Sequence, residues 1–80
     1  MEAIEKWGGN NYTYTDENFS ILQSYHVIIA KKVGNIVYLD EKFWDYSITT
    51  IRARNKFLGE SSKEIKRKIY IGEYKLINLN

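Results

Sequence analysis

The alternation of apolar and polar residues is clearest between residues 24 and 40. A β-branched and aromatic run, Ser24–Lys32, is followed by Gly34 and Asn35 and then by a second such run, Ile36–Asp40. Gly-Asn between two strand-like runs is typical of a tight hairpin turn, because glycine supplies the positive φ that such turns require. The pattern therefore predicts an antiparallel hairpin. The residues expected to share its core face are Ile28, Ala30, Val37 and Leu39.

Helical spacing begins in the stretch WDYSITTIRARNKFLG, residues 44–59. Ile48, Ile51 and Leu58 fall on one arc of a helix, and Gly59 suits a left-handed C-cap. We expect this arc to lie in the core, so that Ile51→Ala destabilises the protein by ~2–5 kcal/mol. The hydroxyl residues expected to cap and orient this helix are Ser47, Thr49 and Thr50.

A second short helix is predicted directly after the first. Ser61-Ser62-Lys63-Glu64 fits a capping box, Ile65 and Ile69 give the helix an apolar seam, and Gly72 ends it. Residues 74–79 then indicate a last strand. The predicted class is α+β, a small single domain with the order β-β-α-α-β. In this domain an antiparallel hairpin and a C-terminal strand pack against two short helices.

The first 18 residues are more polar and more turn-prone than the rest of the chain. We expect residues 1–18 to form a partly ordered N-terminal arm and residues 19–80 to form a single α+β domain. Within the arm, Tyr12 and Tyr14 alternate as in a short strand.

A helix is the alternative prediction for the region of the first hairpin strand. The residues at helical spacing there are Phe19, Leu22, His26 and Ile29.

Composition excludes several kinds of site. The chain has 80 residues, no cysteine and one histidine, His26, which rules out disulfides and metal sites built from histidine and cysteine. No nucleophile with a neighbouring base accompanies His26, and no Gly-rich phosphate loop is present. We therefore expect neither an enzyme nor a cofactor or metal. The longest apolar run, Val27–Ala30, is too short to cross a membrane, so we expect a cytoplasmic protein without a membrane partner.

Two sets of residues are candidates for binding. Aromatic residues make up 15% of the chain, which is typical of interfaces and leaves open a homodimer. The candidates for binding a protein partner are Tyr38, Trp44, Arg52, Lys56, Lys63, Lys66 and Arg67. As the alternative, the start of the first helix and the basic second helix would bind nucleic acid or a nucleotide through phosphate. The candidates for that phosphate site are Thr49, Thr50, Arg52 and Arg54. With a net charge of only +2, such binding would be local.

Part of the chain resembles small proteins of phages and mobile elements from low-GC bacteria. The resemblance lies in a hairpin of the form SY…IA…G…VYL over residues 24–39, in a YSxTTxR…FLG segment over residues 46–59, and in a GEYKL…LN ending over residues 72–80. The sequence departs from that pattern at Ile51 and Ala53, where the similar proteins carry a small polar residue and a histidine. This departure weakens a polar or catalytic role for that face of the helix.

The resemblance implies a source and a class of function. Small phage proteins that are neither virion components nor enzymes often bind and block host machinery, as anti-CRISPR and other anti-defence inhibitors do. The expected function is stoichiometric binding to a host protein or defence complex. This expectation rests on analogy with the similar proteins rather than on a motif of known chemistry.

Overall fold

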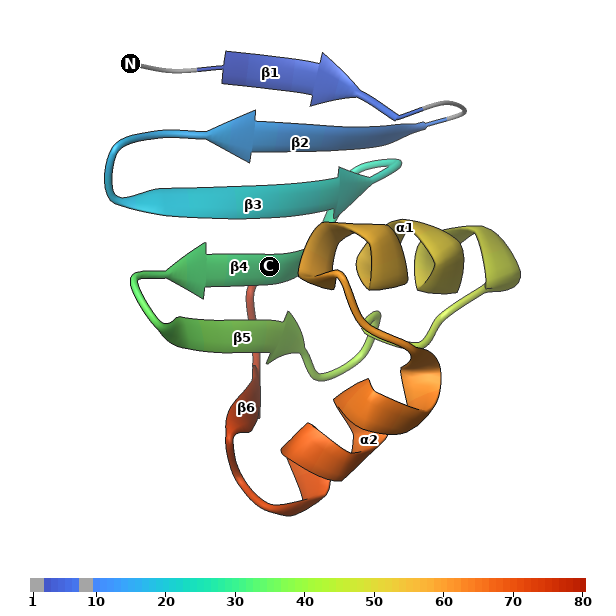
Figure 1. Cartoon of the computed structure of the whole chain (residues 1–80). Coiled ribbons are helices and arrows are strands. Elements are labelled where there is room, and N and C mark those ends of the chain that lie inside the picture. Colours follow the sequence, from blue (N-terminus) through green and yellow to red (C-terminus); the bar gives the residue numbers. More distant parts are fainter. Residues whose placement is uncertain (1–2, 8–9) are drawn as a thin grey trace.

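The computed structural model describes residues 3–7 and 10–80 and shows one six-stranded sheet with two helices (Figure 1). The strands lie side by side in chain order, and every neighbouring pair is antiparallel except β5 and β6, which are parallel. The two helices form the crossover that this parallel pair requires. The elements are β1 (Ala3–Lys6), β2 (Asn11–Thr15), β3 (Phe19–Ser24), β4 (Val27–Val33), β5 (Ile36–Asp40), α1 (Ile48–Leu58), α2 (Ser62–Tyr70) and β6 (Tyr74–Ile77).

The α+β class is confirmed, but the predicted order β-β-α-α-β lacks three of the six strands. Two of the missing strands, β1 and β2, come from the stretch of residues 1–18 that was expected to form an arm. Both are hydrogen-bonded into the sheet, and β2 contains the alternating Tyr12 and Tyr14. Residues 1–2 and 8–9 of this stretch lie outside the described residues. In the described part of the chain, neither helix has the length and apolar character needed to cross a membrane.

The third missing strand is β3, which lies almost entirely before the predicted strand Ser24–Lys32 and shares only Ser24 with it, whereas that predicted strand corresponds to β4. Tyr25 and His26 form a turn between β3 and β4, and Tyr25 adopts a φ of 57°. Glycine, asparagine or aspartate normally occupy such a position, so the residue types gave no turn signal here. The competing helix over residues 19–29 is also wrong, since this region is strand and turn.

A β-bulge decides which residues of β4 face the core. The pairing with β3 passes from Ala30 directly to Ile28, so Ile29 is the extra residue of the bulge. Ile29 is fully buried, whereas Ile28 lies on the opposite face and is half-buried. The predicted core face is therefore correct for Ala30, Val37 and Leu39 and wrong for Ile28.

Helix α1 packs on β3 and β4 through a different face from the one its apolar spacing predicts (Figure 1). Ile48 is 70% exposed, and Ile51 and Leu58 are only half-buried. Instead Phe57 is buried, with its ring centroid 6.1 Å from that of Trp7, because its ring removes more apolar surface from water than Ile48 would. The residues that α1 buries are Thr50, Ala53, Arg54 and Phe57. The apolar core comprises Leu22, Ile29, Ala30, Val37, Leu39, Ala53, Phe57 and Ile65.

Helix α2 begins and ends as predicted. Ser61 Oγ accepts from the amide of Glu64 at 3.2 Å, and Ile65 is fully buried in the core. The other half of the capping box gives way to an ion pair, because the Glu64 carboxylate accepts from the guanidinium of Arg67. Gly72, with φ 83°, follows the helix and allows the chain to turn back into β6.

Two carboxylates fix the C-terminal part of the chain. Asp40 is 1% exposed and accepts from the amides of Lys42, Phe43 and Leu79 and from the side chain of Asn80, at 2.9–3.0 Å. Burial opposes ionisation of this carboxyl, but the four hydrogen bonds outweigh burial and lower the pKa of Asp40. The second carboxylate belongs to Glu60, which accepts from the Tyr74 hydroxyl and pairs with Lys68. Burial together with the hydrogen bond to Glu60 raises the pKa of Tyr74 to about 12.

Candidate functional site

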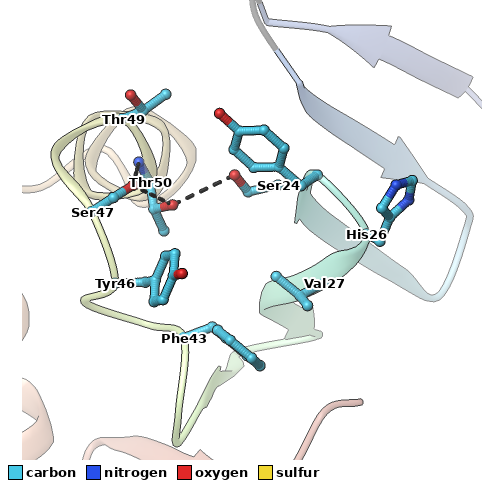
Figure 2. Close-up of a pocket in the computed structure, with 9 residues that line it drawn as sticks. Ser24, His26, Val27, Phe43, Tyr46, Ser47, Thr49 and Thr50 are labelled. Carbon is cyan, nitrogen blue, oxygen red and sulfur yellow. Dashed lines mark hydrogen bonds between the residues drawn. The ribbon is translucent and has the colours of Figure 1, made fainter.

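An open cleft lies between the start of α1 and the turn that joins β3 to β4 (Figure 2). Its volume is about 550 Å³. Three segments that are distant in sequence form its walls: the β3–β4 turn, the loop after β5 and the first turn of α1. The residues that line it are Ser24, Tyr25, His26, Val27, Phe43, Tyr46, Ser47, Thr49 and Thr50.

Hydroxyl groups connect α1 to the sheet beside this cleft. Ser47 Oγ accepts from the Thr50 amide at 3.2 Å and donates to Thr50 Oγ1 at 3.0 Å. Thr50 Oγ1 lies 3.5 Å from Oγ of Ser24, and both residues are 1% exposed (Figure 2). The predicted N-cap at Ser47 is therefore confirmed. The hydroxyl of Thr50 is used inside the protein, which leaves Thr49 as the exposed hydroxyl of the predicted pair.

Aromatic side chains form the outer walls of the cleft. The rings of Phe43 and Tyr46 meet edge to face, with centroids 5.6 Å apart. Of the residues that line the cleft, Tyr25 is 56% exposed and Tyr46 is 68% exposed. Two large rings of the cleft are therefore left uncovered by the rest of the described chain. A non-glycine residue at positive φ, such as Tyr25, costs roughly 1–2 kcal/mol, and such strain often occurs at functional sites.

Arg54, predicted to bind phosphate, is instead a structural residue. Its side chain is fully buried and its guanidinium donates to the carbonyl of Trp44 at 2.9 Å and to Oδ1 of Asp45 at 3.0 Å. Further donors reach the side chains of Asn55 at 3.1 Å and Ser62 at 2.9 Å. One cation thereby links the loop before α1, α1 itself and the start of α2. Its donors point into the protein and are not available to a ligand.

The other predicted phosphate residues do not converge. Thr49 lines the cleft, Thr50 is buried, and Arg52 is exposed on α1 but does not line the cleft. With Arg54 engaged elsewhere, the start of α1 offers hydroxyl and aromatic groups rather than a cationic phosphate cradle.

The predicted partner-binding residues lie on two sides of the molecule. Tyr38 belongs to β5 and alternates onto the face of the sheet that is turned away from the helices, as its register with Lys31 and Lys75 shows. Trp44 is half-buried against the core, with its ring centroid 5.2 Å from the guanidinium carbon of Arg54. The remaining predicted residues are exposed on the helices. They are Arg52, Lys56, Lys63, Lys66 and Arg67, of which Lys56 lies over the Trp7 ring and Arg67 pairs with Glu64.

Sequence reasoning missed the β3–β4 turn and therefore missed the cleft. Tyr25 and His26 were assigned to a strand, where they could not face the start of a helix. One signal was available, because the strand-like residues from Phe19 to Val33 run much longer than the five or six residues of an ordinary strand. A turn near the middle of that run would have placed both side chains at the ends of two strands instead of within one.

Residues 1–73 match family DUF8033, which is described as a family of unknown function. The chain belongs to this DUF8033 family. The match includes every residue that lines the cleft and both helices, and it ends before β6. Searches of curated proteins and of solved structures gave no match. Membership in DUF8033 therefore adds no activity to the geometry described above.

Proposed function

We propose that this DUF8033 protein acts by stoichiometric binding to another protein, without catalysis and without a cofactor. The cleft at the start of α1 receives a side chain or short segment of the partner. The observation that carries this proposal is the pair of exposed rings that line the cleft, Tyr25 and Tyr46, which are 56% and 68% exposed. Exposed apolar clusters of this kind mark interaction sites, and tyrosine is among the residues that dominate binding energies.

The proposed biological role is inhibition of a bacterial defence or nuclease complex inside the host cell, as anti-CRISPR proteins do. The resemblance of residues 24–80 to small phage proteins supports this role. A domain of 80 residues inhibits most simply by covering a functional surface of its target. The cleft gives such a domain one concave site with aromatic walls, which suits an anchor residue of the target.

Affinity capture from a bacterial host lysate tests the proposal, with Tyr46→Ala as the variant and Tyr70→Ala as the matched control. Tyr70 is 91% exposed at the end of α2 and does not line the cleft. The wild-type chain should retain a specific protein in near-equal amount. An interface anchor is worth at least 2 kcal/mol, so Tyr46→Ala should weaken the purified complex roughly 30-fold or more.

The control decides how that result is read. Tyr70→Ala should bind as the wild type does, because it removes the same chemical group from a distant surface. If both variants bind the partner equally well, the cleft is not the contact site. If the wild-type chain retains no protein near equimolar amount, stoichiometric binding itself is refuted.

A further inference from the structure

The sheet has a second face that no helix of the described chain covers. Helix α1 lies over one face of the sheet (Figure 1). From the two helices, Ala53, Phe57 and Ile65 join Leu22 and Leu39 in the core. Strand residues that alternate away from that core form what we call the open face. Its members on the six strands are Ile4, Lys6, Tyr12, Tyr14, Phe19, Ile21, Gln23, Ile28, Lys31, Val33, Ile36, Tyr38, Asp40, Lys75 and Ile77.

One row of the open face crosses the whole sheet. The register pairs Ile4 with Tyr14, Tyr14 with Ile21, Ile21 with Lys31, Lys31 with Tyr38 and Tyr38 with Lys75. Strands lie about 4.8 Å apart, so the five steps of this row span roughly 24 Å. Rings and ammonium groups are thus placed along one line across the sheet, in the order aliphatic, ring, aliphatic, ammonium, ring, ammonium.

A shallow groove adjoins this row over β1 to β4. It has a volume of about 390 Å³ and lies between the two rings Tyr12 and Tyr14 and the aliphatic side chains of Ile21 and Ile28. On the other side of the row, the Phe19 ring stacks on Tyr14 with centroids 5.9 Å apart. The ammonium group of Lys31 lies 5.0 Å from the centroid of the Phe19 ring. A ring and a cation therefore lie across the row from the groove, which itself has the rings of Tyr12 and Tyr14 in its walls.

The charged side chains of the open face indicate which kind of ligand it would bind. Among the described residues that alternate onto it, the cations are Lys6, Lys31 and Lys75. The one acid is Asp40, which is 1% exposed and already accepts four hydrogen bonds. A second copy of the chain packed face to face would bring like charges together, which disfavours a homodimer through this face. A negatively charged polymer would instead be attracted by the three lysines.

We propose that the open face binds single-stranded nucleic acid. Bases stack on Tyr12, Tyr14 and Tyr38, and phosphates lie near the three lysines. Rings and ammonium groups recognise bases and phosphates, which DNA and RNA share, so binding does not discriminate between the two sugars. Base-paired nucleic acid hides its base faces, so the same surface binds duplex more weakly. This inference is independent of the cleft, which lies on the helix side of the sheet.

Fluorescence anisotropy with a labelled 15-nucleotide oligothymidine at 50 mM salt tests the proposal. Three phosphate contacts to a single strand predict that log K falls with log salt with a slope of about −2. The charge reversals Lys6→Glu and Lys75→Glu should each weaken binding and make this slope shallower. Both side chains are exposed, so these variants are expected to fold. The matched control is Lys63→Glu, an exposed lysine on α2.

A ring substitution tests the stacking. Tyr14→Leu keeps an apolar side chain on the face, and loss of one stacked base should lower the affinity roughly tenfold. Oligouridine should bind about as well as oligothymidine, and an unlabelled duplex of equal length should compete poorly. The proposal is overturned if no binding is detected at 50 mM salt, or if Lys63→Glu weakens binding as much as Lys75→Glu does. Competition by polyglutamate as strong as that by oligothymidine also overturns it, in favour of an acidic peptide.

Discussion

Replacement of Arg54 by methionine is the most direct test of how α1 is held in place. Methionine keeps most of the volume of the side chain but removes every donor of a guanidinium that is fully buried. The carbonyl of Trp44 would lose its 2.9 Å bond, and Ser62 and Asn55 would lose bonds of 2.9 and 3.1 Å. Each hydrogen bond to a charged group contributes about 1.5–3 kcal/mol, but such bonds do not add fully.

The ion pair with Asp45 contributes less than its 3.0 Å distance suggests. The side chain of Asp45 is 38% exposed, so water solvates the carboxylate again once Arg54 is gone. Loss of the buried hydrogen bonds, offset by the apolar contacts of methionine, gives an expected destabilisation of about 3 kcal/mol. For a domain of this size that corresponds to a fall in Tm of roughly 12–24 °C.

Urea unfolding followed by tryptophan fluorescence measures this change, with Arg52→Met as the matched control. Arg52 lies on the same helix and is exposed, so its replacement should leave the unfolding midpoint unchanged within error. If Arg54→Met unfolds at the same urea concentration as the control, the reasoning is wrong, and Arg54 would be free to serve the phosphate site that the sequence suggests. Equal losses in both variants would indicate a general effect of charge on α1.

Three further predictions concern packing and pH. Phe57→Ala should lower the free energy of unfolding by about 3–5 kcal/mol. Ile48→Ala, at a side chain that is 70% exposed, should leave stability nearly unchanged. If urea unfolding shows the larger loss for Ile48→Ala, the helix face predicted from spacing is the one that packs on the sheet. Asp40→Asn should destabilise the protein at neutral pH. Because the folded state lowers the pKa of Asp40 from its ordinary 3.8, this stabilisation is present above that value and is lost as pH falls through the lowered pKa. The difference between wild type and variant should therefore shrink in acid, and a difference independent of pH down to 2 would contradict it. At high pH the sign is opposite, because the pKa of Tyr74 is raised to about 12. Stability should fall between about pH 10 and pH 12, and Tyr74→Phe should make that fall smaller in unfolding curves measured across this range.

Local chemistry predicted the boundaries of the helices well. Ser47 and Ser61 cap α1 and α2, and Gly59, with φ 68°, ends α1, because each of these roles depends on one residue and its near neighbours. The turn at Gly34 between β4 and β5 was predicted correctly for the same reason. The turn at Tyr25 was not predicted, because it contains no residue type that signals a turn.

Side-chain orientation was predicted less well because it depends on the tertiary structure. Spacing along α1 allows either Ile48 or Phe57 to face the sheet, and the contact of Phe57 with Trp7 decides between them. No residue type in the sequence signals the bulge at Ile29. The bulge places Ile28 on the open face instead of the predicted core face. The role of Arg54 was hidden similarly, since its acceptors come from Trp44 and Ser62, ten and eight residues away.

Strand β3 connects the two proposed binding surfaces. Ser24 points toward α1 beside the cleft, and its neighbour Gln23 points to the open face, because successive side chains of a strand alternate between the two faces. A ligand on one surface therefore does not occupy the space of a ligand on the other. A partner protein in the cleft and a nucleic-acid strand on the open face would be held on opposite sides of one sheet. In the described part of the chain, both helices contribute to the core on one side of the six-stranded sheet, and no helix lies on the open face. We infer that the lysines among the rings disfavour face-to-face packing with a second copy and favour a polyanion on that face.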